Sequence, residues 1–252
     1  MSKIRNEKKG IRLAAGLMAV MMMAAVPFTA AAAEPWDKEN GQYVDASGAP
    51  IAGALEKGIT VTKYQNRANA DKGGIDWAKV AADGVNFAMI RIGYYKDMDP
   101  YYSMNMQGAS ENGIKTGVFF YTQALDTQSA IDEANYVLKM VRDYPVSYPI
   151  AYDVESQHLL DNGLTKQQIT DNINAFCKVI SAGYRPVVYA NNEWLTNHMD
   201  ISQIPYDIWY ARYGTINNCQ NRTIWQCTDK GRVDGITGDV TIEFSFVDYG
   251  TL

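Results

Sequence analysis

The sequence predicts an α/β fold, an irregular TIM-like (β/α) barrel with helices partly missing in its second half. Eight apolar segments rich in β-branched and aromatic residues recur between residues 58 and 247. Helical patterns separate the first five segments, which favours parallel pairing, whereas the later connections are too short for full helices. A length of 252 residues also suits a single barrel of this class.

The expected strands have similar lengths and end in polar or aromatic residues. In chain order, we expect strands at 58–62, 85–92, 114–121, 148–154, 184–190, 206–212, 222–228 and 239–247.

Four helices are expected between the early strands, at 76–83, 103–112, 127–143 and 165–182. The last has the clearest pattern, since Thr165 and Gln168 have the spacing of a capping box. Gly183 is a suitable stop for this helix.

Composition and charge exclude several classes of protein. With 47% hydrophobic and 20% charged residues, the chain is neither disordered nor fibrous. Its net charge of -5 and sequence pI near 5.1 argue against binding to nucleic acid, which requires a basic face. We therefore expect no nucleic-acid partner.

The first 33 residues are typical of a secretory signal peptide. A basic start precedes an apolar stretch, Leu13 to Phe28, and Ala31–Ala33 forms an A-x-A cleavage site. The alternative is an uncleaved anchor, because Leu13 to Ala33 is just long enough to span a bilayer. We expect a protein that is secreted to the extracellular space or cell wall, with no stable membrane association after cleavage.

The mature chain divides into an arm and a domain. Residues 34–56 contain Pro, Gly and turn residues without periodicity, so we expect an N-terminal arm. Residues 57–252 hold the barrel domain, which we expect to be monomeric.

The three cysteines lack the paired spacing of a zinc site, so we expect no metal and no cofactor. Cys219 and Cys227 could form a bridge in an oxidising compartment, an alternative that the sequence leaves open. Cys177 has the position of a small core residue in a helix.

The strongest chemical signal is a pair of acids at the end of the fourth strand, in the segment YPIAYDVES. In a (β/α) barrel, working groups lie at the carboxyl ends of the strands. Asp153 and Glu155, two residues apart, would point to one side of a strand, and their mutual repulsion would leave one of them protonated. Glycoside hydrolysis needs such a division of labour. The alternative is a solvated strand end.

Aromatic and amide side chains gather at the other predicted strand ends. Rings of this kind stack on sugar faces while their polar tips donate hydrogen bonds, although ordinary barrel packing would place such rings there too. The candidate substrate-binding residues at these positions are Tyr94, Tyr121, Tyr189, Asn191, Trp209, Tyr210 and Trp225.

Taken in order, the strand-end segments resemble the glycoside hydrolase family 25 lysozymes. The resemblance rests on GITVTKYQ, GGIDW, VNFAMIRIGYY, GVFFYTQAL, PIAYDVES, RPVVYANNEWL, DIWYARYG and IWQCTDKGRVDGITGDV. It implies an irregular (β/α) barrel without metal or cofactor. It also implies N-acetylmuramidase activity on peptidoglycan, at the bond between N-acetylmuramic acid and N-acetylglucosamine, with Glu155 as general acid and Asp153 as the neighbouring carboxylate.

Two positions depart from the family pattern. Its first strand usually reads G-I-D-V-S and its last V-D-L-N, and here Thr60 and Thr241 stand at the two aspartate positions. Losing two charges near Glu155 should lower its pKa, while the threonine hydroxyls keep a means of contacting a sugar. Glu243, two residues after Thr241, could act as a substitute acid or be an exposed residue of an edge strand.

These departures leave two functions open. The intact acids favour an active cell-wall glycosidase, whereas the paired threonines favour a catalytically impaired module that binds cell-wall glycan. A glycosidase with an altered substrate is a further alternative.

Overall fold

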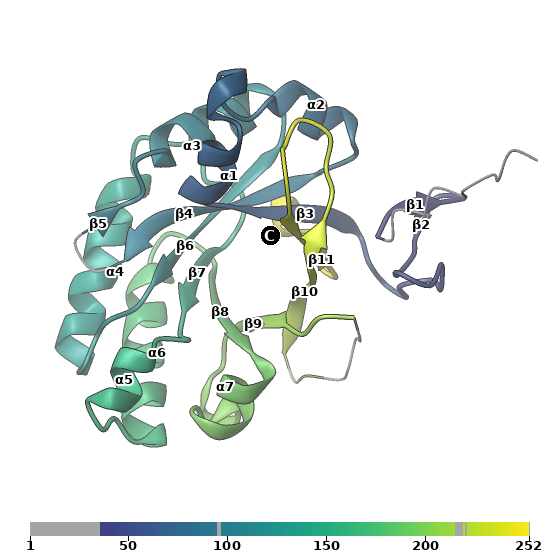
Figure 1. Ribbon diagram of the computed structural model, residues 1–252. Coiled ribbons are helices and arrows are strands. Elements are labelled where there is room, and N and C mark those ends of the chain that lie inside the picture. Colours follow the sequence, from purple (N-terminus) through teal and green to yellow (C-terminus); the bar gives the residue numbers. More distant parts are fainter. Residues whose placement is uncertain (1–35, 95–96, 215–218, 220, 252) are drawn as a thin grey trace, which may run out of the picture. The chain divides into compact units, whose positions relative to one another are not determined.

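Eight strands close into a barrel in the computed structural model, which describes residues 36–251 apart from 95–96, 215–218 and 220 (Figure 1). All the described residues belong to one compact unit. The barrel strands, in their order around the barrel, are β3 (Glu56–Val61), β4 (Phe87–Tyr94), β6 (Lys115–Tyr121), β7 (Ile150–Asp153), β8 (Pro186–Asn191), β9 (Asp207–Ala211), β10 (Arg222–Gly231) and β11 (Val240–Ser245).

Strand direction divides the barrel into a long parallel part and one reversed strand. From β3 through β10 every neighbouring pair is parallel, whereas β11 is antiparallel to both β10 and β3. The connection 232–239 between β10 and β11 is too short for the crossover that a parallel strand needs. The predicted fold class and all eight predicted strands are confirmed, with this one reversal that the alternating pattern did not predict.

Helices cover the first half of the barrel, as Figure 1 shows. The four predicted helices are confirmed as α2 (Trp77–Ala82), α3 (Tyr102–Glu111), α4 (Thr127–Val141) and α6 (Lys166–Ile180). Three further short helices were not predicted: α1 (Lys63–Ala68), α5 (Gln157–Asp161) and α7 (Asn192–Asn197). Short 3₁₀ turns lie at Ala70–Lys72, Ile201–Gln203 and Tyr249–Thr251, and β5 (Asp97–Met98) extends the sheet beside β4.

Alternate residues of each strand face two different cores. Because neighbouring strand residues point to opposite faces, Ala88 and Ile90 pack with the helices while Phe87 and Met89 fill the barrel interior. In the outer core, Tyr152 of β7 stacks on Phe176 of α6 with ring centroids 3.9 Å apart. The inner cluster consists of Phe87, Met89, Phe119, Tyr148, Ala151, Val187, Trp209, Ile224 and Tyr249.

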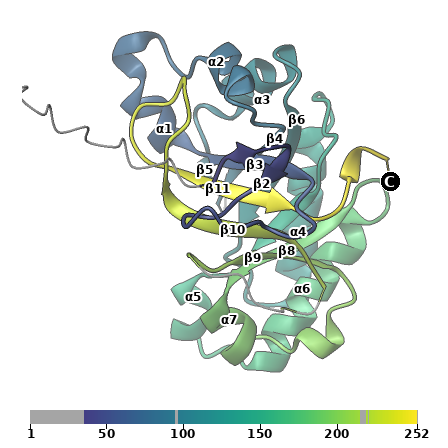
Figure 2. The ribbon, with the colours of Figure 1, turned by 90° about the vertical axis from the view of Figure 1, so that its right-hand side faces the viewer.

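The arm packs on the side of the barrel that lacks helices. Its hairpin, β1 (Lys38–Glu39) and β2 (Gln42–Tyr43), lies in front of β3, β11 and β10 in Figure 2. Trp36 meets Trp225 edge-on at 5.6 Å, and the Tyr43 ring lies 5.1 Å from Phe244. Aromatic burial by the arm therefore replaces the helices that this half of the barrel has lost.

Other expectations fall partly outside the structure. The predicted signal peptide, residues 1–33, lies outside the described residues. Among the residues that the structure describes, no helix is long and apolar enough to cross a bilayer. Cys227 is a buried free thiol that donates to the Ile242 carbonyl at 3.2 Å, so the alternative of a bridge to Cys219 is wrong.

The capping box of α6 provides a test of the fold. The Gln168 amide donates to Thr165 Oγ1 at 3.3 Å, and Gln168 Oε1 accepts from the Thr165 amide at 2.9 Å. We expect Thr165→Ala to lower the free energy of unfolding by about 1 kcal/mol, measured by urea denaturation. Thr127→Ala, at the exposed first residue of α4, should cost less than about 0.5 kcal/mol. Equal losses in the two variants would contradict the capping role.

Candidate functional site

The carboxyl ends of the parallel strands bring most of the predicted polar residues together. Tyr121, Asp153 and Tyr189 are register partners on β6, β7 and β8. On the other side of the barrel, Thr60 of β3 is the register partner of Thr241 of β11. The barrel therefore assembles at one end residues that lie far apart in the sequence.

Asp153 is the last residue of β7 and is buried. Its Oδ1 atom is also buried and has no hydrogen-bond partner among the described residues. Burial raises the pKa of Asp153 well above its ordinary value, and the charge of Glu155 raises it further, while Arg91 opposes the shift. The ionised form of Asp153 is thus costly at this position, and the positive charge of Arg91 reduces that cost.

Glu155 lies two residues beyond the end of β7, in the loop before α5, and not within a strand as expected. Its Oε1 atom accepts a short hydrogen bond from the Asn191 backbone amide, and the Tyr121 hydroxyl donates to the Glu155 carbonyl at 3.3 Å. Burial raises the pKa of Glu155, and the Asn191 amide works against that shift. The acid pair can therefore hold a proton at a pH at which exposed carboxyls have lost theirs.

The threonines at positions 60 and 241 do not leave this pair with ordinary acidity. The sequence indicated that removing two charges would lower the pKa of Glu155, and burial acts in the opposite direction. Burial is the larger cause, so the pKa of Glu155 stays above the ordinary glutamate value.

Glu243 is completely buried, so the alternative of an exposed residue on an edge strand is wrong. The barrel closes through β11, which leaves that strand without a free edge. Oε1 of Glu243 accepts from Thr60 Oγ1 at 2.7 Å and from Gln226 Nε2 at 2.9 Å, while Oε2 is buried and has no partner in the described part of the chain. Burial raises the pKa of Glu243 to about 7.

A hydrogen-bonded chain runs from Glu243 toward the acid pair. Gln226 Oε1 accepts from the hydroxyls of Tyr189 at 3.0 Å and Tyr213 at 3.2 Å. Tyr189 is the register partner of Asp153, so the chain connects the two sides of the barrel. The Thr60 amide donates to Thr241 Oγ1 at 3.2 Å, and both threonines are therefore engaged within the protein.

The predicted aromatic residues separate into three groups. Tyr121 and Tyr189 lie beside the acids, whereas Trp209 is buried in the inner cluster with its Nε1 atom unpartnered among the described residues. Tyr210 and Trp225 point into the outer core, because each follows an inward-facing residue. The structure therefore does not bring these last two to the acids.

Side-chain bonds hold Tyr210 and Trp225 in that outer position. The Tyr210 hydroxyl donates to Asn192 Oδ1 at 2.7 Å, and Trp225 Nε1 donates to the Arg212 carbonyl at 2.8 Å.

Tyr94 lies at the rim of this end of the barrel with 41% of its surface exposed. It lines a pocket of about 530 Å³ together with Gln123, Leu125, Asp126, Ser129 and His158. An exposed ring over a wide pocket near the acids suits contact with a large polar ligand that has apolar faces.

Arg91 is a site residue that the sequence reasoning missed. It extends from β4, and its Nε and Nη2 atoms donate to Asp99 Oδ2 at 3.0 and 2.7 Å. Its positive charge lowers the pKa of Asp153. An arginine inside the apolar run VNFAMIRI was the signal that could have revealed it.

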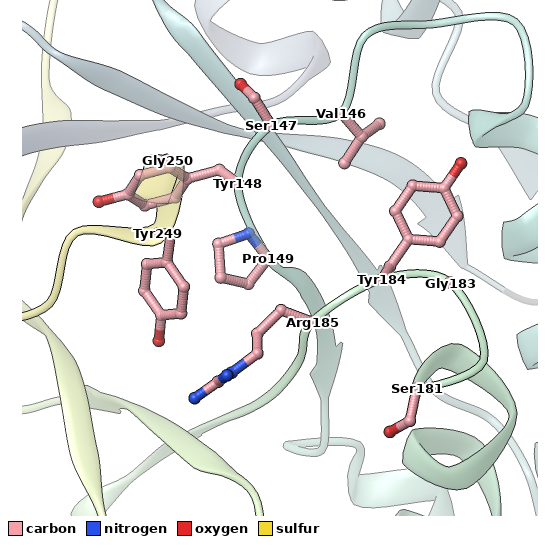
Figure 3. Close-up of a pocket in the computed structure, with 10 residues that line it drawn as sticks. All are labelled: Val146, Ser147, Tyr148, Pro149, Ser181, Gly183, Tyr184, Arg185, Tyr249 and Gly250. Atoms are coloured by element: carbon pink, nitrogen blue, oxygen red, sulfur yellow. The ribbon is translucent and has the colours of Figure 1, made fainter. Parts of the chain in front are cut away.

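A second pocket, of about 480 Å³, lies at the opposite end of the barrel (Figure 3). Pro149 and Arg185, in its wall, directly precede β7 and β8, which places the pocket at the amino ends of these strands. The rings of Tyr148 and Tyr249 meet edge-on there at 5.1 Å and are buried. This pocket is therefore separate from the acid pair, and its tyrosines act as packing for the barrel floor.

No group of three His, Cys, Asp or Glu residues suited to a metal ion occurs in the described ranges. Glu155 instead accepts from a backbone amide and Glu243 from a hydroxyl, while Arg91 is bonded to Asp99.

Comparison with known proteins gives one family and several similar chains. The family described as Glycosyl hydrolases family 25 matches residues 59–236. The uncharacterized protein YegX of Escherichia coli K12 is 27% identical over 194 residues, which cover 73% of this chain and 66% of YegX. The chain thus spans slightly less than two thirds of the length of this curated relative.

Two solved structures share the fold. The modular autolysin LytC of Streptococcus pneumoniae, which was also crystallised with a synthetic peptidoglycan ligand, superposes with a TM-score of 0.71 at 22% identity, covering 83% of this chain and 52% of LytC. A bacterial lysozyme from Streptomyces coelicolor gives a TM-score of 0.62 at 25% identity, covering 75% of this chain and 90% of the lysozyme.

The buried carboxyl of Glu243 makes a pH-dependent prediction. Its pKa rises from an ordinary 4.5 to about 7 on folding, so the folded state holds a proton that the unfolded state releases. The free energy of unfolding should therefore fall as pH rises between these values, by about 3 kcal/mol from this residue. Glu243→Gln removes the titration, so its stability relative to the wild type should increase from pH 4.5 to 7.5 in urea denaturation.

The control for this experiment is Glu39→Gln, which removes a negative charge from an exposed position of the hairpin. Its stability relative to the wild type should stay nearly constant over the same pH range. A Glu243→Gln difference that is independent of pH would refute the assignment of a buried, protonated Glu243.

Proposed function

Since the chain is a glycoside hydrolase of family 25, we propose that it is a secreted, monomeric peptidoglycan hydrolase of the cell wall. In this proposal it is an N-acetylmuramidase that cleaves the glycan between N-acetylmuramic acid and N-acetylglucosamine. The similarity to a bacterial lysozyme and to an autolysin crystallised with a peptidoglycan ligand supports this substrate.

One observation carries the proposal: a buried carboxyl at the end of β7 and a half-buried one two residues later lie at one end of a closed barrel, and burial raises the pKa of both. Glycoside hydrolysis requires an acid that protonates the leaving oxygen and a carboxylate that stabilises the positive charge developing on the sugar. Glu155 is the less buried of the two and is oriented by the Asn191 amide, so it takes the role of general acid. Asp153, at the strand end, takes the role of neighbouring carboxylate.

In the proposed reaction, the proton held by this pair passes from Glu155 to the substrate. Burial keeps one proton on the two carboxyls, and substrate binding removes further water from them, which favours the protonated acid. When Glu155 gives its proton to the glycosidic oxygen, the bond from that oxygen to the anomeric carbon breaks, and the negative charge on the pair stabilises the sugar cation. Water then adds to the anomeric carbon and returns a proton to Glu155. Arg91 limits the cost of that charge on Asp153.

The proposed sugar contacts come from the rim and the mouth of the barrel. The exposed ring of Tyr94 offers a stacking surface, and Tyr121, Tyr189 and Asn191 lie next to the acids. Trp209 is excluded from these contacts, because its ring lies buried in the inner cluster. Thr60 and Thr241 contribute indirectly, because their hydroxyl groups bind Glu243 and the strand backbone.

A second candidate function is a module that binds cell-wall glycan without turnover. It is favoured by the internal engagement of Thr60 and Thr241, since neither hydroxyl adds a negative charge beside Glu155. In this alternative the aromatic rim and the acids hold the glycan, and the bond is not cleaved.

Glu155→Gln separates the two candidates. We expect the wild type to release reducing ends from purified peptidoglycan and the variant to lose at least about a hundredfold in rate, because Gln cannot donate the proton. Binding to insoluble peptidoglycan, measured by co-sedimentation, should persist in the variant. Turnover that does not depend on Glu155 would refute its role, and binding without wild-type turnover would favour the second candidate.

Glu243 is proposed to act as a partial substitute for the acids that the family has at positions 60 and 241. It is linked to Tyr189 through Gln226, and so to the neighbour of Asp153. We expect Glu243→Gln to lower kcat/KM for peptidoglycan about tenfold above pH 7, where the carboxyl of Glu243 is ionised, because an electrostatic contribution of about 1.4 kcal/mol is lost. The exposed-charge variant Glu39→Gln should retain full activity. Unchanged kcat/KM and unchanged affinity in Glu243→Gln would show that the residue is only structural.

A further inference from the structure

A half-buried carboxyl group on a helix is hydrogen-bonded to the strand ends beside the acid pair. Glu133 belongs to α4 and is not part of the proposed catalytic pair. Three donors converge on it: the Gln123 amide at 2.9 Å on Oε1, and the hydroxyls of Thr122 at 2.8 Å and Tyr152 at 2.7 Å on Oε2. A carboxylate that accepts three hydrogen bonds is held in one position.

The three donors come from the two strand ends that carry the site. Thr122 and Gln123 follow β6 directly, and Tyr152 is the residue of β7 before Asp153. The hydroxyl oxygens of Tyr152 and Thr122 also lie 2.7 Å apart, so either hydroxyl can donate to the other when it does not donate to Glu133. Glu133 therefore ties α4 to both β6 and β7 at the level of the acids.

From these donors, further bonds reach the loop that holds Glu155. Gln123 Nε2 donates to Ser156 Oγ at 2.6 Å, and the Thr122 amide donates to the Asp153 carbonyl at 3.0 Å. Ser156 is buried and directly follows Glu155. The backbone on both sides of Glu155 is thus held by groups that Glu133 orients.

We propose that Glu133 is a positioning residue that fixes the Glu155 loop through Gln123 and Ser156. The inference rests on the proposed function, because it assigns Glu133 to the catalytic geometry of the same site. A displacement of about 1 Å of a catalytic group can lower the rate about a hundredfold. Loosening of the Glu155 loop should therefore lower the rate measurably.

The chemistry of the three donors explains why this position needs a carboxylate. Each carboxylate oxygen accepts more than one hydrogen bond, so all three donors are satisfied at once. An amide has only one acceptor oxygen, so with that oxygen toward the Gln123 amide its NH₂ group would donate to the two hydroxyls. Replacing Glu133 by Gln therefore keeps the side-chain shape but reverses the direction of the bonds to Thr122 and Tyr152, whose protons must turn to other acceptors.

The test compares Glu133→Gln with Asp132→Asn, which removes a charge from the preceding, exposed residue of the same helix. For Glu133→Gln we expect kcat for reducing-end release to fall about tenfold while KM changes less than about twofold. Asp132→Asn should match the wild type in both constants.

A second measurement does not depend on turnover. The Asn191 amide donates to Glu155, so its hydrogen exchange by NMR reports whether the acid is held in place. In Glu133→Gln this exchange should become about tenfold faster, with no change in Asp132→Asn. If the wild type shows no turnover, the proposed function fails, and the exchange measurement still decides the role of Glu133.

A second variant, at Ser156, tests the same series of hydrogen bonds if Glu133→Gln does not fold. Ser156→Ala removes the bond from Gln123 and should reproduce the loss in kcat and the faster Asn191 exchange. In the double variant the two losses should not add, because both cut one path. A lower melting temperature with unchanged kcat and unchanged Asn191 exchange, in either single variant, would overturn the proposal.

Discussion

Burial of two neighbouring carboxyl groups at the end of one barrel strand is the constraint on which the site depends. Isolated carboxylates are costly to bury, and the structure offsets that cost by keeping a proton on the Asp153–Glu155 pair and by directing the Asn191 amide at Glu155. Closure of the barrel produces the burial, because inner side chains fill the space below the acids. The barrel thus supplies the burial that raises the pKa of both acids.

The two threonines change where negative charge lies in this barrel. At the rim, Thr60 and Thr241 supply hydroxyls, while the carboxyl of Glu243 lies buried on β11 and is bonded to one of them. An ionised carboxylate beside Asp153 and Glu155 would raise their pKa by repulsion. The carboxyl of Glu243, with a pKa of about 7, has this effect only at a pH at which it is ionised. In the proposal that Glu243 partly substitutes for the family's two aspartates, one carboxyl of this end of the barrel is kept in a buried position.

Periodicity predicted the eight strands and four of the helices because these patterns are local, and the ordered strand-end segments carried the resemblance to the family. The reversal of β11 was not predicted, since it follows from the short connection after β10. Tyr210 and Trp225 were predicted to line the site because they lie near the ends of their strands. The alternation of side chains along β9 and β10 instead points both rings into the outer core. The sequence alone gives no indication of the role of Glu133, because its three hydrogen-bond partners come from the ends of two separate strands.

The central claim is that the Asp153–Glu155 pair keeps a proton through burial and delivers it from Glu155. Titration of the side-chain carboxyl ¹³C resonances of both residues by NMR, beside the pH profile of kcat/KM on peptidoglycan, tests this most directly. The account predicts that one proton of the pair is lost well above the ordinary carboxyl range, at the pH where activity falls on its basic side. Loss of both protons at ordinary carboxyl pH values, with activity unaffected there, would contradict it.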